Sequence, residues 1–190
     1  MRHRRAFVAA LLLWCSAAGP TSVAVPAALV VRGACRDGQP NGAYELRDRD
    51  GQLRALGAFH AGKPTGTFIF WNDAGGRLAA IPYDDGVRNG TIATWHIGGK
   101  PPRERGRKLE LPVVRGEAQG VMRAWHPNGQ LHAEAEFVHG RPVRVVAWDA
   151  AGRQLVPAQA SRAVHDELMG SETNLARLER LVSGHVPVCE

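Results

Sequence analysis

The sequence predicts a mainly β protein: an antiparallel β-hairpin repeat array, with units of about 24 residues joined in a single-sheet meander, and a short C-terminal helical cap. Two observations support this prediction, a regular glycine spacing and an aromatic residue in constant register with it. Glycine accounts for 22 of the 190 residues, and 19 of them lie between Gly33 and Gly152. Such a density excludes a helical bundle, because each interior glycine costs a helix about 1 kcal/mol.

The chain begins with the pattern of an export signal. Residues 1–5 are basic, residues 6–14 are apolar, and small residues precede Ala18 and Ala24. We therefore expect residues 1–24 to be a cleaved signal peptide and the protein to be periplasmic or secreted. The alternative is an uncleaved N-terminus that anchors the protein in a membrane, although Pro20 and Pro26 would interrupt a membrane helix.

The net charge of the chain is mild once this leader is set aside. The whole sequence has 24 basic and 18 acidic residues, a formal charge of +6. Arg2, Arg4 and Arg5 belong to the leader, and no acidic residue precedes Asp37. The remaining chain has 21 basic and 18 acidic residues, or +3. This balance does not indicate a nucleic-acid partner, which usually requires a concentrated basic face.

The repeats occupy residues 25–156 and comprise five units. Four segments share the pattern Gly-x-x-x-Gly, namely 38–42, 62–66, 86–90 and 116–120, and a fifth keeps only Gly140. The first glycines are 24, 24, 30 and 24 residues apart, so one unit has a six-residue insertion, near residues 100–108. A tryptophan follows the first glycine by eight or nine residues in four units.

Each unit has the pattern of a β-hairpin. The Gly-x-x-x-Gly stretch is rich in Asn, Asp and Pro, which is typical of a turn. Residues 67–71 are short and β-prone, residues 72–75 form a second turn signal, and the return strands alternate apolar residues, as in Leu131, Ala133, Ala135 and Phe137. One hairpin cannot bury its apolar face alone, but several paired side by side can.

These units resemble the membrane occupation and recognition nexus (MORN) repeat in its bacterial variant form. The best match runs from Gly116 to Phe137 and includes WHPNGQL at residues 125–131, and the resemblance covers about residues 31–155. It implies a non-enzymatic interaction module, and in bacteria it suggests the YwqK-type, antitoxin-like or immunity-like proteins. Arg47 stands where this pattern expects an aromatic residue.

Residues 157–190 form a tail with a different composition. Apolar residues recur at helical spacing, at Val164, Leu168, Leu175, Leu178 and Val182. Ser161 and Ser171 suit helix N-caps, Gly184 suits a helix stop, and Gly170 would split the segment into two short helices. We expect a helix that covers the open end or face of the sheet, with a partner-binding amphipathic helix as the alternative.

Few residues suggest chemistry. His96 and His126 each follow a repeat tryptophan, and we expect both at equivalent, exposed turn positions. No spacing typical of a metal site and no Gly-x-Ser-x-Gly nucleophile motif occurs. We therefore predict no enzyme, no cofactor and no metal site, with a hydrolase as the least favoured alternative.

Two sets of residues are candidates for binding. Trp71, Trp95, Trp125 and Trp148 recur once per hairpin, either as a structural spine or as an exposed strip for a peptide or glycan. Arg103, Arg105, Arg107 and Lys108 lie in the insertion, either as a solvated loop or as a contact for an anionic partner. The favoured function is a protein–protein interaction module, and the alternative is a binder of the envelope or membrane surface through the basic insertion.

Two cysteines remain after the leader, Cys35 and Cys189. An exported protein in an oxidising compartment rarely keeps idle thiols, so a bond between them is the preferred prediction. Cys35 stands at the position that is Phe59, Tyr83 and Phe137 in other units, which directs it toward the covered face of the sheet. An intermolecular disulfide and free thiols remain open.

Overall fold

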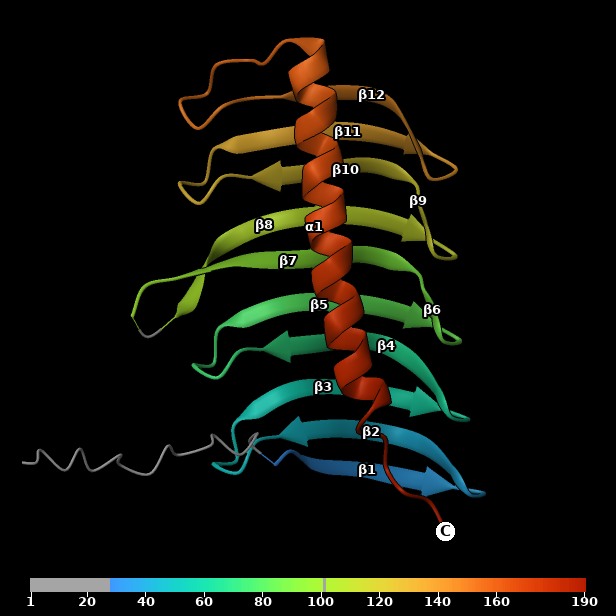
Figure 1. Cartoon of the computed structure of the whole chain (residues 1–190). Coiled ribbons are helices and arrows are strands. Elements are labelled where there is room, and N and C mark those ends of the chain that lie inside the picture. Colours follow the sequence, from blue (N-terminus) through green and yellow to red (C-terminus); the bar gives the residue numbers. More distant parts are fainter. Residues whose placement is uncertain (1–27, 101) are drawn as a thin grey trace, which may run out of the picture.

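The computed structural model describes residues 28–100 and 102–190 and confirms the predicted fold class (Figure 1). Twelve antiparallel strands form one open sheet, and a single helix lies across it. The elements are β1 (Val30–Arg36), β2 (Gln39–Arg47), β3 (Leu53–His60), β4 (Lys63–Trp71), β5 (Arg77–Asp84), β6 (Val87–Arg88), β7 (Gly90–Gly98), β8 (Arg103–Val114), β9 (Glu117–Ala118), β10 (Gly120–Trp125), β11 (Leu131–Val138), β12 (Arg141–Ala147) and α1 (Pro157–Ser183). The expected signal peptide, residues 1–24, lies outside the described residues.

Each strand pairs with its neighbour in sequence, as in a meander. The order is β1-β2-β3-β4-β5-β7-β8-β10-β11-β12, and the short strands β6 and β9 pair with β5 and β8. β6 and β7 are therefore two parts of one return strand, and so are β9 and β10. The sheet has β1 at one edge and β12 at the other.

The first glycine of each Gly-x-x-x-Gly segment lies in a tight turn at one side of the sheet, whereas the rest of the segment, which the sequence predicted as turn, belongs mostly to the strand that follows. In the second unit, Ala61 and Gly62 have φ angles of 46° and 77° and join β3 to β4. Two successive positive φ angles define a type I′ turn, which matches the twist of antiparallel strands. Gly66, the second glycine of that unit, also has a positive φ of 66°, so the pattern reflects two separate backbone requirements.

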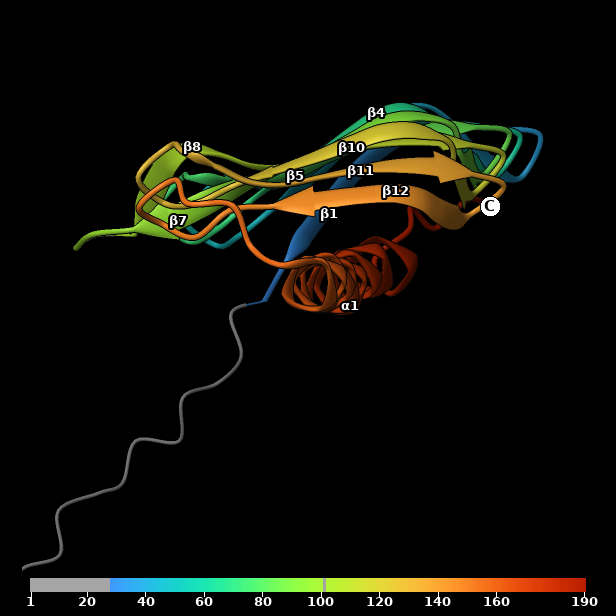
Figure 2. The same ribbon diagram turned by 90° about the horizontal axis from the view of Figure 1, so that it is seen from above.

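The core lies between α1 and one face of the sheet (Figure 2). Successive side chains on a strand point to opposite faces, and the buried residues follow this alternation. One cross-strand row under the helix runs through Leu46, Ala55, Phe70, Ala79, Thr94, Leu109, Ala124, Ala133 and Ala147. From α1, Ala160, Val164, Ser171, Leu175 and Val182 are buried against this face.

The tail forms one continuous helix, so the expected break at Gly170 is wrong. A Cβ at Gly170 would have open space around it, and burial of the apolar helix face outweighs the modest helix propensity of glycine. The N-caps expected at Ser161 and Ser171 are also wrong, because the helix begins at Pro157 with Val156 as N-cap and Ser171 is buried in its middle. Gly184 is the C-cap, as predicted. Within the described residues, no helix has the length and apolar character needed to cross a membrane.

Candidate functional site

The tryptophans occupy equivalent places at the second turns, but their environments differ. Trp71, Trp125 and Trp148 are half-buried, whereas Trp95 is only 9% exposed. The guanidinium carbons of Arg77 and Arg107 lie 4.4 and 4.7 Å from the centre of the Trp95 ring, from the two neighbouring strands. Cation–π contacts therefore occupy the Trp95 ring, and the four tryptophans do not form one uniformly exposed strip.

The basic insertion lengthens a hairpin. Ile97 pairs with Glu104 and Gly98 with Arg103, so the ladder of β7 and β8 continues almost to the tip. This differs from the expected solvated loop, because the six-residue insertion adds ladder pairs on both strands beyond two shifts of register, between Thr94 and Trp95 and between Trp95 and Ile97. Arg105 is exposed beyond the body of the sheet.

The structure also separates the basic residues of the insertion. Arg107 lies against Trp95 and 3.3 Å from the carboxylate of Glu110. The Lys108 ammonium lies 3.0 Å from the carboxylate of Glu167 on α1. Arg107 and Lys108 therefore hold neighbouring parts of the fold together, which leaves the insertion with less free positive charge than its sequence indicates.

The two repeat histidines connect neighbouring units. His96 Nε2 lies 2.7 Å from the carbonyl oxygen of Trp125, and His126 Nε2 lies 2.9 Å from that of Trp148. Both side chains are half-buried, so the expectation that they are exposed is wrong. Their positions are equivalent, as predicted, and each ring can donate a hydrogen bond across the gap between second turns.

Another histidine, His132, lies beside the contact between His126 and the Trp148 carbonyl. His132 Nδ1 is 3.2 Å from His126 Nε2, and the ring centres are 4.4 Å apart. Burial and the neighbouring His126 lower the pKa of His132 below its ordinary value. Within the described residues, no group of three or more His, Cys, Asp or Glu side chains is placed to hold a metal ion.

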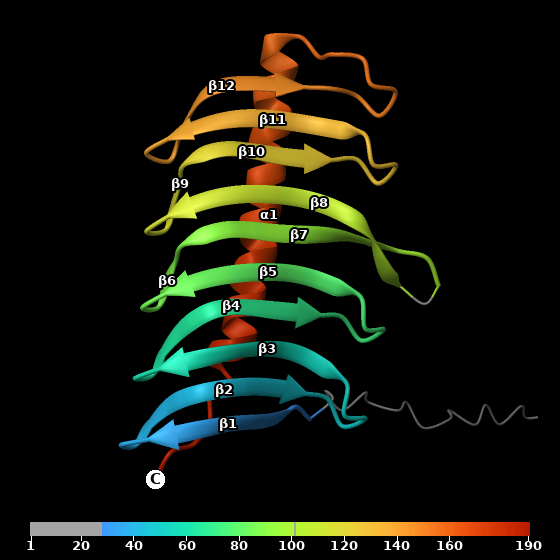
Figure 3. The same ribbon diagram turned by 180° about the vertical axis from the view of Figure 1, so that it is seen from behind.

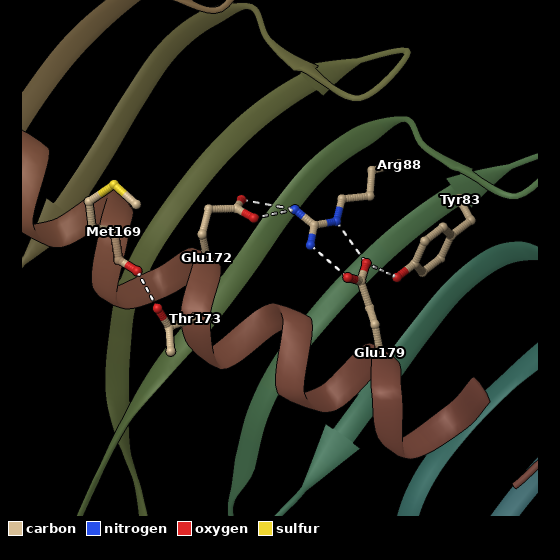
Figure 4. Close-up of polar contacts among 6 residues, drawn as sticks. All are labelled: Tyr83, Arg88, Met169, Glu172, Thr173 and Glu179. Carbon is tan, nitrogen blue, oxygen red and sulfur yellow. Dashed lines mark hydrogen bonds and ion pairs between the residues drawn. The ribbon is translucent and has the colours of Figure 1, made fainter. Parts of the chain in front are cut away.

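A polar cluster that the sequence did not reveal joins the sheet to the helix (Figure 4). The Arg88 guanidinium donates two hydrogen bonds of 2.8 Å to Glu179 and two of 2.9 and 3.0 Å to Glu172. The hydroxyl of Tyr83 also donates to Glu179. Burial alone would raise the pKa of Glu179, but the hydrogen bonds from Arg88 and Tyr83 outweigh it and hold that pKa below its usual value.

Arg88 departs from the repeat in a way that could have drawn attention. Two residues after the first glycine, three of the five units have a proline, at Pro40, Pro64 and Pro142, and the third unit has Arg88. An arginine on the covered side of a sheet needs a partner, because an unpaired charge there would lose its hydration. Glu172 and Glu179 on the helix supply that partner.

The predicted intramolecular disulfide is present between Cys35 and Cys189, with Cα atoms 5.7 Å apart. Beside it, the Tyr44 hydroxyl donates a 2.9 Å hydrogen bond to the carbonyl of His185. Burial raises the pKa of Tyr44 to about 12. The segment after α1 is thereby fixed to β1 and β2, at the end of the sheet farthest from the start of the helix.

The face of the sheet opposite α1 has no covering element in the described part of the chain (Figure 3). A cross-strand row there places four apolar residues side by side: Leu56, Ile69, Ala80 and Ala93. Charged residues continue the row on both sides, namely Arg32 and Glu45 toward β1, and Glu110, Arg123 and Glu134 toward β12. We call this surface the uncovered face.

The described surface offers grooves rather than a deep cleft. A groove of about 470 Å³ lies between β12 and the start of α1, and its lining includes Phe137, Val143, Val164 and Leu168. Its lining contains no carboxylate, and its ionisable side chains are Arg144 and His165. Ser161 also lines the groove, but the hydrogen bonds of the described residues do not join it to His165, as activation of a serine nucleophile would require.

Comparison with known proteins gave no match: no family model matches the chain, and no curated protein matches it significantly. The fold and the surfaces of the protein itself therefore carry the functional argument.

Proposed function

We propose that this chain is an exported, non-enzymatic repeat protein that serves as a protein–protein interaction module. The observation that carries the proposal is the one-sided covering of the sheet: α1 packs on one face, and the uncovered face has an apolar row between charged ends, half-buried at Leu56, Ile69 and Ala80 and 7% exposed at Ala93. Extended repeat surfaces of this kind commonly bind other proteins. The disulfide is compatible with an oxidising compartment.

The MORN-like pattern of the repeats supports the same proposal. Its first glycines lie in the turns between strands, its second glycines lie within the following strands or at their start, and its tryptophans lie at or near strand ends, so the motif encodes a scaffold rather than a catalytic site. The antitoxin-like or immunity-like function that the resemblance suggests is one form of protein binding, and it belongs to the proposal.

A pull-down from envelope extract with the protein lacking residues 1–24 tests the proposal. We expect specific capture of a protein, and a substitution on the uncovered face, Ile69→Glu, should abolish or weaken it. Thr173→Glu, an exposed position on α1 and therefore on the other side of the sheet, is the matched control. If capture is absent, or if neither the uncovered face nor an edge of the sheet affects it, the proposal fails.

Salt dependence separates this proposal from binding of an anionic surface through the basic insertion. Binding through exposed charges weakens above about 0.15 M salt, whereas apolar contact on a sheet face does not. The ion pairs of Arg107 and Lys108 favour the protein-binding proposal, because both cations already have carboxylate partners.

A further inference from the structure

The two edges of the sheet differ in how they end. At β12, the Leu155 amide donates a 2.8 Å hydrogen bond to the Ala147 carbonyl, and Trp148 forms a bridge with Gln154. The chain itself therefore closes the β12 edge at its Ala147 end, and Pro142 removes a donor near the other end, both features of an edge protected against pairing.

The β1 edge lacks these features. β1 spans seven residues, contains no proline, and pairs only with β2 among the described strands. Alternate residues of such an edge strand point their N–H and C=O groups away from the sheet, and these groups can pair with another strand. The edge thus offers a template of ordinary strand length.

The charged side chains of β1 all have one sign. Arg32 and Arg36 are exposed, and the described acidic groups form no ion pair with either. Arg32 lies opposite Glu45 in the ladder, but the Glu45 carboxylate binds Arg47 at 2.9 Å.

The other side of β1 is apolar. Pro187 lies over Gly33, where an added Cβ would come 2.4 Å from its ring, so the tail crosses the covered side of β1. Val186 and Val188, on either side of this proline, are 44% and 91% exposed. Exposed apolar side chains therefore gather around an edge whose opposite side presents arginine.

The disulfide fixes this edge in place. Cys35 belongs to β1 itself, and its bond to Cys189 ties the edge strand to the segment that follows the helix. The chain end emerges past β1 near the carboxyl end of that strand and does not run along it (Figures 1 and 3). An edge strand held in this way loses less conformational freedom when another strand pairs with it.

We propose that the β1 edge binds an extended segment of a partner protein as an additional strand, and that this segment alternates acidic and apolar residues. Its acidic side chains face Arg32 and Arg36, and its apolar side chains face Val186 and Val188. Backbone hydrogen bonds supply affinity and the alternating side chains supply specificity. This inference rests on the proposed function and names the surface and the partner chemistry.

The probe is a fluorescent synthetic peptide of about nine residues, an ordinary strand length, that alternates Glu and Val. It is titrated into the protein lacking residues 1–24, with the disulfide intact. We expect saturable binding, slower amide hydrogen exchange in residues 30–36 and unchanged exchange in residues 141–147. Failure to bind at about 1 mM peptide overturns the proposal.

Two matched controls test the chemistry. The charge reversal Arg32→Glu with Arg36→Glu should weaken binding about tenfold or more, whereas Arg141→Glu, an exposed arginine on the closed β12 edge, should have little effect. A peptide with alternate backbone amides methylated should not bind. Equal binding by that peptide, or by one with Lys in place of Glu, overturns the proposal.

A second copy of the chain is the competing occupant, and sedimentation measures it. Concentration-dependent dimerisation that protects residues 30–36 and that the peptide does not reverse would overturn the proposal in favour of β1–β1 pairing. If a captured protein binds normally to the Arg32→Glu, Arg36→Glu variant, this inference fails while the proposed function stands.

Discussion

The two ends of α1 are held to the sheet in different ways. Near its start, the helix backbone comes close to β11 and β12, where three small residues, Ala133, Ala135 and Ala147, line the covered face beside Phe137. Toward its end, the helix lies over the strands that carry the large rings of Tyr44, Phe59, Phe68, Phe70 and Tyr83. Small side chains allow a close approach, and large rings hold the helix farther away.

This difference explains where the strong connections lie. At the close end, the chain itself joins β12 to the helix through a short segment. At the distant end, the Cys35–Cys189 disulfide and the hydrogen bond from Tyr44 to His185 fix the chain after the helix. The ion pairs of Arg88 and Lys108 lie between these ends. The helix is thus connected covalently to the sheet at both ends, to β12 through the preceding chain and to β1 through the disulfide.

The largest expected effect comes from removing the disulfide. Its cysteines are 154 residues apart, and breaking a bond that closes so long a loop costs about 4 to 5 kcal/mol in the chain-entropy model. We expect the Cys35→Ser, Cys189→Ser variant to lose about that much free energy of unfolding, measured by urea denaturation. Hydrogen exchange should accelerate more at residues 175–183 than at residues 157–165. Equal acceleration at both ends would show that the disulfide does not specifically hold the C-terminal end of the helix.

The next effect contrasts the two linings of the core. Phe68 is 1% exposed and contacts several aromatic rings, so Phe68→Ala should cost about 3 to 5 kcal/mol through the cavity that it leaves. Ala135→Leu, at the close end, should cost about 1 to 3 kcal/mol by overpacking, because the helix backbone lies close to its strand. A neutral Ala135→Leu variant would show that the helix moves away freely there.

A smaller effect is expected at the polar cluster in the middle of the helix. Arg88→Met leaves Glu179 half-buried without its main partner, and we expect a loss of about 2 to 3 kcal/mol near neutral pH. Lys63→Met, whose ion pair with Asp85 is largely exposed, is the control and should cost less than about 1 kcal/mol. Chemical denaturation at pH 7 measures both.

The same cluster has a defined pH dependence. The pKa of Glu179 is lower in the fold than its ordinary value of 4.5, so its pairing stabilises the protein above that pH and is lost as the pH falls below it. In Arg88→Met, only the hydrogen bond from Tyr83 would oppose the effect of burial on the pKa of Glu179, so the loss of stability on acidification should shrink or change sign. An acid limb identical to that of the unchanged protein would contradict this assignment.

The sequence predicted the fold because the information that determines it is local. Glycines with positive φ, the strand between two turns and the alternation of apolar residues recur in each unit, so five imperfect copies support one interpretation. The disulfide was also predictable, since Cys35 occupies the covered position that is aromatic in other units. The continuous helix was not, because the sheet that stabilises Gly170 in a helix lies far away in sequence.

The contacts of the candidate residues were less predictable for the same reason. The partners of Arg88 lie 84 and 91 residues away on α1, and nothing in the repeat indicates which helix position faces which strand. The burial of Trp95 depends on Arg77 and Arg107 from neighbouring strands, and the stabilising contact of Lys108 depends on Glu167. Spacing identifies equivalent positions, but cross-strand and helix–sheet neighbours decide whether those positions are free.

The smallest expected effect lies near the close end of the helix, at the pair of histidines. His126 Nε2 can donate one proton toward both the Trp148 carbonyl and His132 Nδ1, which then must accept. A proton on His132 Nδ1 would oppose that donor, and burial together with His126 lowers the pKa of His132, while Glu167 nearby opposes the shift and Lys108 adds to it. The unfolded chain therefore binds this proton more readily than the folded one.

The free energy of unfolding should fall as the pH drops below about 6.5, where the unfolded histidine titrates, and level off below the lowered pKa of the folded state. His132→Gln should remove this part of the pH dependence between about pH 7.5 and 5.5, whereas His60→Gln, at an exposed position on β3, should keep it. Urea denaturation measures the slope of unfolding free energy against pH. An unchanged slope in His132→Gln would show that a neutral His132 does not stabilise the fold near the start of the helix.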